Sequence, residues 1–152
     1  ALKINMQMPN YIANSVEKSL SQKSLEKSVI ICGLSYKPNV EDMRDSASFK
    51  IISDLKKKDF KVFGYDPYFS DESIEKYLIE NNLNELNFEK IESLNDKNLK
   101  GISCLCVVQH HDNVKERILE IYKQGEIPLI YDCQHKISKE SNSKSILEFL
   151  GE

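Results

Sequence analysis

The sequence predicts an α/β fold in which a parallel sheet carries helices on both faces. Short apolar runs alternate along the chain with segments whose apolar residues recur at helical spacing. One strand and one helix together take about 30 residues, which is what parallel strands joined by helices require. With 152 residues, the chain is long enough for one domain with a core of its own.

The first predicted element is a helix over residues 1–20. Its apolar residues recur mostly three or four positions apart, at Ile4, Met8, Tyr11, Ile12, Val16 and Leu20. Pro9 interrupts the pattern, which predicts a kink or a break between two helical pieces. Residues 21–27 are polar and form a connection.

A strand, a helix and a second strand follow. Residues 29–32 are a continuous apolar run, as buried parallel strands show. Residues 46–58 form a helix with lysines near its C-terminal end, where the helix dipole favours cations. Residues 61–65 form the second strand, which ends before Pro67 because proline cannot continue a central ladder.

The second half of the chain repeats the alternation. The predicted elements are a helix over 73–80, a turn and a short extended piece over 81–88, a helical turn over 94–99, a strand over 102–108, a helix over 114–123 and a strand over 129–131. Residues 145–150 fit a strand or a helix equally well.

Composition excludes some classes of partner. The net charge is −3 and no basic stripe occurs, which argues against nucleic acid. No apolar run approaches the ~20 residues of a membrane span, and the first residues show no signal-peptide pattern. We therefore expect a cytoplasmic protein without membrane contact. Because the chain starts Ala-Leu-Lys without Met, we also expect it to be a piece of a longer protein.

All four cysteines lie inside or at the end of apolar runs, at Cys32, Cys104, Cys106 and Cys133. This placement predicts buried, reduced thiols. The alternative is a metal site formed with the neighbouring histidines. No C-x-x-C or H-x-x-x-H spacing supports it, so we do not expect a metal.

The stretch "GLSYKPNVEDMRDS" follows the first strand and so lies at the carboxyl edge of the predicted sheet, where open α/β sheets bind ligands. A phosphate-binding turn would be rich in glycine, but this loop has only Gly33 and carries Lys37 and Arg44 instead. These two cations could bind an anion by charge. Alternatively, Glu41 and Asp42 pair with them in a solvated loop, where ion pairs contribute little.

Six residues of this loop match the pattern Gly-x-x-aromatic-Lys-x-x-x-x-Asp-x-Arg-x-Ser in register: Gly33, Tyr36, Lys37, Asp42, Arg44 and Ser46. The chain thereby resembles the C-terminal domain of the nucleotide-sugar dehydrogenases, the UDP-glucose and UDP-N-acetylmannosamine dehydrogenase family. The stretches "VFGYDPY" and "VVQHHDNVK" have counterparts there in the same order. "INMQMPNYIANSVEKSL" is similar to the end of the family's long central helix, in the form typical of the N-acetylmannosamine branch.

The resemblance implies a Rossmann-like, UDP-sugar-binding C-terminal domain over residues 28–152 and makes residues 1–22 the tail of a connecting helix. Such enzymes oxidise a C6 hydroxyl to a carboxylate by two hydride transfers to NAD, through a thiohemiacetal and a thioester, for polysaccharide precursors. Tyr36 and Lys37 would contact the UDP-sugar and Arg44 would reach NAD. The implied partners are an N-terminal NAD-binding domain, a central domain and a second copy in a homodimer.

The chain departs from the family in two ways. It contains no Gly-x-Gly-x-x-Gly and lacks the segment with the nucleophilic cysteine, so we expect no catalytic residue in it. The family's late substrate-binding arginine is also missing, and its region holds Gln134, His135, Lys136 and Lys139 instead. Either a lysine substitutes, with less bidentate reach, or this contact is lost.

Two further residues have competing interpretations. His111 aligns with a histidine that the family places before a helix, and we expect it to cap that helix and pack beside the cleft. Asp66 could be a ribose-binding acid at the end of the second strand. With Pro67 next to it, we favour a turn-forming residue.

A second function from another class is a non-catalytic module of flavodoxin-like or receiver-like type that binds a partner or a small ligand. A receiver needs an acidic pair at the end of its first strand. Cys32 and Gly33 stand there instead, which argues against this alternative.

Overall fold

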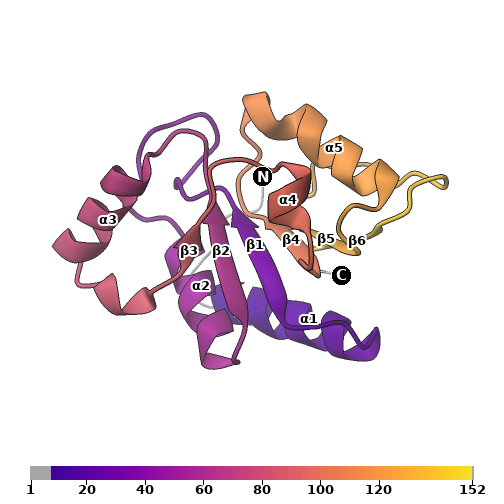
Figure 1. Cartoon of the computed structure of the whole chain (residues 1–152), viewed down its shortest axis with the longest axis horizontal. Coiled ribbons are helices and arrows are strands. Elements are labelled where there is room, and N and C mark those ends of the chain that lie inside the picture. Colours follow the sequence, from indigo (N-terminus) through magenta and orange to yellow (C-terminus); the bar gives the residue numbers. More distant parts are fainter. Residues whose placement is uncertain (1–7, 152) are drawn as a thin grey trace.

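The computed structural model describes residues 8–151. One sheet of six parallel strands runs through the molecule in the order β3-β2-β1-β4-β5-β6 (Figure 1). The strands are β1 (Ser28–Cys32), β2 (Lys61–Tyr65), β3 (Glu89–Lys90), β4 (Cys104–Val107), β5 (Leu129–Asp132) and β6 (Ile146–Phe149). The predicted parallel sheet is confirmed.

Helices cover both faces of the sheet, as predicted. They are α1 (Met8–Gln22), α2 (Ser48–Lys57), α3 (Asp71–Glu80), α4 (Asp96–Leu99) and α5 (Lys115–Gln124), with short 3₁₀ turns η1 (Asn84–Leu86) and η2 (Asp112–Val114). Figure 1 shows α1 and α2 on one side of the sheet and α4 and α5 on the other. None of the helices within residues 8–151 has the length and apolar character needed to cross a membrane.

The order in which the chain adds strands to the sheet changes direction between β1 and β4, although all strands stay parallel. From β1 the chain builds outward through β2 to β3, and then returns to place β4 on the other side of β1. Val29 of β1 therefore pairs with Val62 on one side and with Cys104 on the other. In sheets of this kind ligands bind beside this reversal point, outside the carboxyl ends of the strands.

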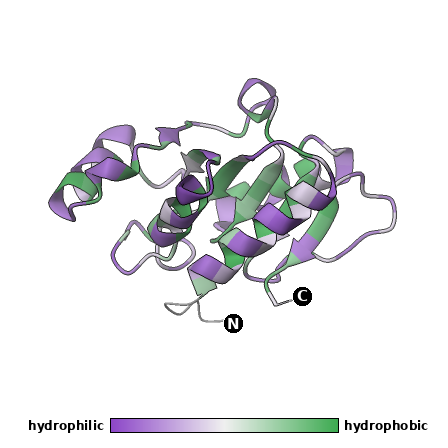
Figure 2. Cartoon of the chain, turned by 90° about the horizontal axis from the view of Figure 1, so that it is seen from below, coloured by the Kyte–Doolittle hydropathy of each residue, from purple (hydrophilic) through white to green (hydrophobic). Residues whose placement is uncertain are grey.

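Each face of the sheet has its own apolar cluster because successive strand residues point to opposite sides. Val29 and Ile31 of β1 join the cluster that α1 and α2 complete. Ile30 and Cys32 join the cluster that α5 completes. Figure 2 shows apolar residues concentrated in the strands of the sheet and polar residues along the helices and loops.

Within residues 8–151 most predicted elements exist, with shifted ends. The extended piece expected within residues 81–88 is an exception, because the 3₁₀ turn η1 lies there and the strand β3 follows it. Pro9 lies in the first turn of α1, where its missing N–H removes no helical hydrogen bond. The predicted helical piece before Met8 lies outside the described residues. Residues 145–150, which the sequence left open, contain strand β6, paired with β5.

Candidate functional site

The charged loop (residues 33–45) leaves β1 at the carboxyl edge and leads to α2. Gly33 has φ +99°, and a Cβ there would lie 2.6 Å from the Cβ and 2.7 Å from the backbone nitrogen of Gln109. Only glycine fits this conformation and this close approach. The single glycine of the loop is therefore required for packing against β4's end, and Gln109 occupies the space beside it.

Hydrogen bonds fix the backbone of the charged loop. The Tyr36 N–H donates to the carbonyl of Asp42 at 3.1 Å, and the Ser35 hydroxyl donates to the carbonyl of Lys37 at 2.7 Å. The side-chain amide of Gln109 donates to the carbonyl of Tyr36 at 3.0 Å. The loop is long but held in one conformation.

The predicted binding side chains point away from this fixed backbone. Tyr36 is 45% exposed, and Lys37 and Arg44 are also exposed. The Lys37 ammonium lies 5.4 Å from the centre of the Tyr36 ring, so these two assigned residues form one cation–aromatic surface. The expected pairing of Lys37 with a loop carboxylate is not seen among its described contacts.

Arg44 pairs with Asp42, one of the two acids that the sequence offered as its partner. Its Nε and Nη2 donate to the two carboxylate oxygens at 3.0 and 2.8 Å. Hydrogen bonds from Arg44 lower the pKa of Asp42 to about 2. The Arg44 side chain is nevertheless 82% exposed, so the pair holds the guanidinium in the solvent rather than burying it.

Behind the charged loop lies a buried pair formed by Asp66 and His111. Asp66 follows β2, and its Oδ2 lies 2.9 Å from Nε2 of His111, whose side chain is 0% exposed. The same oxygen accepts the Leu34 N–H at 2.7 Å. His111 stands at the predicted position, as the N-cap residue of η2, but its side chain makes no capping hydrogen bond. Its Nδ1 instead accepts the Asn39 N–H of the charged loop.

The turn-forming role predicted for Asp66 is confirmed, since its Oδ1 accepts the Tyr68 N–H at 2.9 Å. Its other oxygen is taken up by the loop and by His111, and the side chain is 0% exposed. Asp66 thus closes its own turn and ties it to the loop after β1.

A second buried pair, Asp132 with His110, stands at the end of β5. Oδ1 of Asp132 lies 2.7 Å from Nε2 of His110, and its Oδ2 accepts the N–H groups of Lys136 and Ile137. Burial raises the pKa of Asp132, but hydrogen bonds from His110 and backbone N–H groups outweigh it, so the pKa lies below its usual range. Asp132 organises the loop after β5 as Asp66 organises the loop after β1.

Two glutamines connect these loops. Sequence reasoning missed Gln109 and named Gln134 only as part of the region that replaces the family's arginine. Gln134 donates from its Nε2 to Oε1 of Gln109 at 2.8 Å, and its own Oε1 accepts the His110 N–H. Gln109 in turn holds the carbonyl of Tyr36. The only signal in the sequence was their position directly after a strand end.

The region that replaces the family's late arginine is exposed at this edge. His135 stacks on Phe149 with ring centroids 3.7 Å apart, and Lys139 lies over the same ring. Lys136 lines a small hollow of about 140 Å³ together with His110 and Lys115. Of the two lysines considered, Lys136 is the one that faces a hollow beside the Asp132–His110 pair.

The cysteines are buried, as predicted, and unpaired. The sulfurs of Cys106 and Cys133 lie 3.8 Å apart in the core. Among residues 8–151, no group of three or more His, Cys, Asp or Glu side chains is arranged to hold a metal ion.

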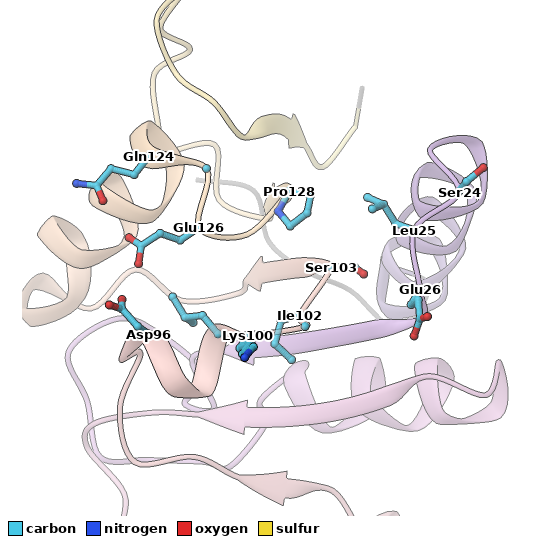
Figure 3. A pocket seen from close by; sticks show the side chains of 13 residues that line it. Ser24, Leu25, Glu26, Asp96, Lys100, Ile102, Ser103, Gln124, Glu126 and Pro128 are labelled. Carbon is cyan, nitrogen blue, oxygen red and sulfur yellow. The ribbon is translucent and has the colours of Figure 1, made fainter.

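A larger hollow, of about 930 Å³, lies at the opposite, amino-terminal edge of the sheet (Figure 3). Its walls come from the segments that lead into β1, β4 and β5 and include Glu26, Ile102 and Pro128. Tyr36, Lys37 and Arg44 do not line it. We place the candidate site at the carboxyl edge, because the charged loop and the loops that follow β2, β4 and β5 meet there.

These features define a doubly wound α/β domain with a charged, ordered loop at its ligand-binding edge. The UDP binding domain of the UDP-glucose/GDP-mannose dehydrogenase family matches residues 30–139, which is more than half of the chain. The chain belongs to this family. The membership decides against the receiver-like alternative.

Curated relatives carry two kinds of name. A UDP-N-acetyl-D-mannosamine dehydrogenase of Methanococcus vannielii is 32% identical over 140 residues, covering 89% of this chain and 29% of the relative. A UDP-glucose 6-dehydrogenase of Rickettsia conorii is 26% identical over 144 residues, covering 94% of this chain and 32% of the relative. The chain thus spans less than a third of these relatives.

A solved structure supports the fold. The UDP-D-ManNAc dehydrogenase from Pyrococcus horikoshii superimposes with a TM-score of 0.69 at 22% identity, over 97% of this chain and 31% of that one. The Rossmann-like fold inferred from the resemblance is confirmed by this similarity.

Proposed function

We propose that this chain binds the UDP part of a nucleotide sugar and forms one side of the active cleft of an NAD-dependent UDP-sugar 6-dehydrogenase. The observation that carries the proposal is the exposed pair of Tyr36 and Lys37 on a loop with a fixed backbone. This pair lies within the stretch matched by the UDP binding domain. A cation beside an aromatic ring suits a ligand with phosphate groups and a flat base.

We further propose that the substrate is UDP-N-acetyl-D-mannosamine and that its C6 hydroxyl is oxidised to a carboxylate. Two observations support this choice over UDP-glucose. The relative at 32% identity is named for that sugar. The Met8-Pro9-x-Tyr11 sequence at the start of α1 has the form typical of that branch.

NAD, which accepts the hydrides in this reaction, fits one point among residues 8–151. Gly33 packs against Gln109, so the turn after β1 offers no open glycine cradle for a pyrophosphate. The Arg44 guanidinium, in contrast, projects into solvent from its pair with Asp42. We propose that Arg44 contacts an NAD held mainly by another domain.

The remaining parts of the enzyme are proposals of the same kind. We propose that residues 1–22 are the tail of a connecting helix and that residues 28–152 are the domain that closes over the UDP-sugar. The nucleophilic cysteine and the main NAD site would come from other domains, and the assembled enzyme would be a homodimer.

Calorimetry with UDP tests the core of the proposal on this chain. We expect UDP to bind, and Lys37→Ala to weaken binding by about tenfold or more, since a hydrogen bond to a charged group contributes ~1.5–3 kcal/mol. Arg44→Ala is the matched control, because it removes another cation from the same loop, one that is assigned to NAD and not to UDP. UDP affinity unchanged in Lys37→Ala, or lost equally in both variants, would contradict the assignment.

The sugar is tested in an enzyme that joins this chain to its NAD-binding and central domains. NAD reduction is followed with UDP-N-acetylmannosamine, UDP-glucose and UDP-N-acetylglucosamine. We expect the highest kcat/KM with UDP-N-acetylmannosamine. A preference for UDP-glucose would overturn the choice of sugar and leave the UDP-binding role intact.

A further inference from the structure

One buried pair, Asp66 with His111, holds the charged loop from behind at two points. Asp66 Oδ2 accepts the N–H of Leu34, which lies at the start of the loop. Nδ1 of His111 accepts the N–H of Asn39 at 2.8 Å, near the middle of the loop. The Asp66 and His111 side chains are 0% exposed and are joined to each other at 2.9 Å. Tyr36 and Lys37 lie between these two attachment points.

We propose that His111 and Asp66 are positioning residues that hold the backbone on both sides of Tyr36 and Lys37 in the conformation that binds UDP. This inference rests on the proposed function of the loop. Neither residue needs to touch the ligand, since both lie beneath the loop and are buried. Their effect on binding is exerted through the N–H groups of Leu34 and Asn39.

The contacts also determine which nitrogen of His111 carries its proton. A backbone N–H is always a donor, so Nδ1 must be the acceptor toward Asn39. Nε2 then carries the hydrogen and donates it to the Asp66 carboxylate. The ring therefore has one acceptor for the loop and one donor for Asp66, and the two functions can be separated by substitution.

Holding the loop before the ligand arrives strengthens binding. A loop that must be ordered on binding loses affinity by the free energy of that ordering, and a preorganised loop avoids this loss. Here the Tyr36 carbonyl is held independently by Gln109, whose own amide is oriented by Gln134. Removing the His111 contact loosens the Asn39 side, where the Asn39 side chain still accepts the Asp112 N–H at 2.8 Å. The Tyr36 carbonyl also stays attached, so we expect a partial loss of affinity.

Two substitutions at one position test the proposal. His111→Gln can still donate to Asp66 but offers no acceptor at the Nδ1 position. His111→Asn places a carbonyl oxygen near that position but cannot reach Asp66. We expect His111→Gln to raise the UDP Kd about tenfold and to speed hydrogen exchange at the Asn39 amide. We expect His111→Asn to keep the UDP Kd within about threefold of wild type despite a lower melting temperature.

Ser28→Ala is the control for general loss of stability. Ser28 is buried at the opposite edge of the sheet, where its hydroxyl donates to the Gly101 carbonyl and accepts the Ser103 N–H. This variant should lower the melting temperature and leave UDP affinity unchanged. If UDP affinity follows the melting temperature across all three variants, or if His111→Gln binds UDP as tightly as wild type, the proposal is wrong.

The test separates this proposal from the proposed function. If wild-type chain fails to bind UDP, the function of the loop is wrong, whereas the Asn39 amide exchange in His111→Gln still reports whether His111 holds the loop. If wild type binds UDP and Asn39 exchange is unchanged in His111→Gln, the positioning role alone is overturned. Should His111→Asn fail to fold, the comparison of His111→Gln with Ser28→Ala decides.

Discussion

Asp132 shows how one buried carboxylate can order a whole loop. Its two oxygens accept backbone N–H groups from four successive residues, 134–137, and it pairs with His110. These bonds favour the charged form, so the pKa of Asp132 lies below its usual range in spite of burial. A carboxylate with a lowered pKa stabilises the fold above its ordinary pKa of about 4. That contribution is lost as the pH falls through the folded-state value.

We expect Asp132→Asn to lower the free energy of unfolding at pH 7 by about 2–3 kcal/mol, because one amide N–H₂ must then face backbone donors. Urea denaturation at pH 7 and at acid pH checks this. The difference between wild type and variant should shrink on the acid side, where wild-type Asp132 takes up its proton. A difference that stays constant down to pH 2 would show that charge is not what holds this loop.

At the scale of secondary-structure elements, the turn after β1 depends on its glycine for two reasons. Gly33 combines a positive φ with contact to Gln109, whereas Gly101 has φ +80° with nothing within 4 Å of a Cβ. The two sites therefore separate backbone strain from crowding. Backbone strain and crowding at Gly33 both matter for the candidate site, because Gly33 sets the direction in which the charged loop leaves the sheet.

We expect Gly33→Ala to destabilise the chain by about 2–5 kcal/mol, from left-handed strain of ~1–2 kcal/mol plus overpacking of ~1–3 kcal/mol. Gly101→Ala should lose only the strain, about 1–2 kcal/mol. Chemical denaturation of both variants measures the difference. Equal losses at the two positions would mean that Gln109 moves aside freely.

The thiols within β1 and β4 and directly after β5 are buried, which suppresses their reactivity. Burial raises the pKa of Cys32 and of Cys104, and the contact with Cys106 together with burial raises that of Cys133. Because the thiolate is the reactive form, we expect all four cysteines to react slowly with a thiol reagent in the native chain and quickly in denaturant. Rapid native labelling of any one of them would show that its strand opens locally.

The elements were largely predictable, and their ends and pairings were not. Residues 61–65 were predicted as the strand that β2 forms, because an apolar run and a following proline are local signals. Helix α2 begins at Ser48 and not at residue 46, since Asp45 adopts φ +59° and the Ser46 hydroxyl accepts the Ser48 N–H before the helix starts. The left-handed backbone conformation of Asp45 could not be predicted from the spacing of apolar residues.

For the candidate site, the positions of some residues could be predicted from the sequence, but their pairing could not. The sequence placed Asp66 at the end of the second strand and His111 beside the cleft, but which histidine meets which aspartate depends on strand order. His110 and His111 are consecutive, and they reach the ends of β5 and β2 respectively, on either side of β1 and β4. The assignment of Tyr36, Lys37 and Arg44 to ligands stays a prediction.

At the scale of the whole molecule, the described residues form a six-stranded sheet that leaves no cysteine accessible. The four cysteines are 0% exposed, and no described turn offers a glycine cradle for NAD. We therefore expect this chain by itself to produce no NADH from any UDP-sugar, measured by absorbance with UDP-sugar and NAD in excess. Adding the NAD-binding and central domains should restore turnover. Measurable turnover by the chain alone would contradict the proposal that the nucleophilic cysteine and the main NAD site lie in other domains.

The reversal of strand order also sets the sequence of events when the chain folds. Central strand β1 has its first neighbour, β2, within the same half of the chain, but its second, β4, lies 75 residues further on. Until β4 is made, the backbone groups of β1 on that side have no partner, and the strand stays an open edge. Such distant pairings are slow to form and expose strands to other chains meanwhile. During synthesis, we therefore expect β1 to keep one open edge until β4 has been made.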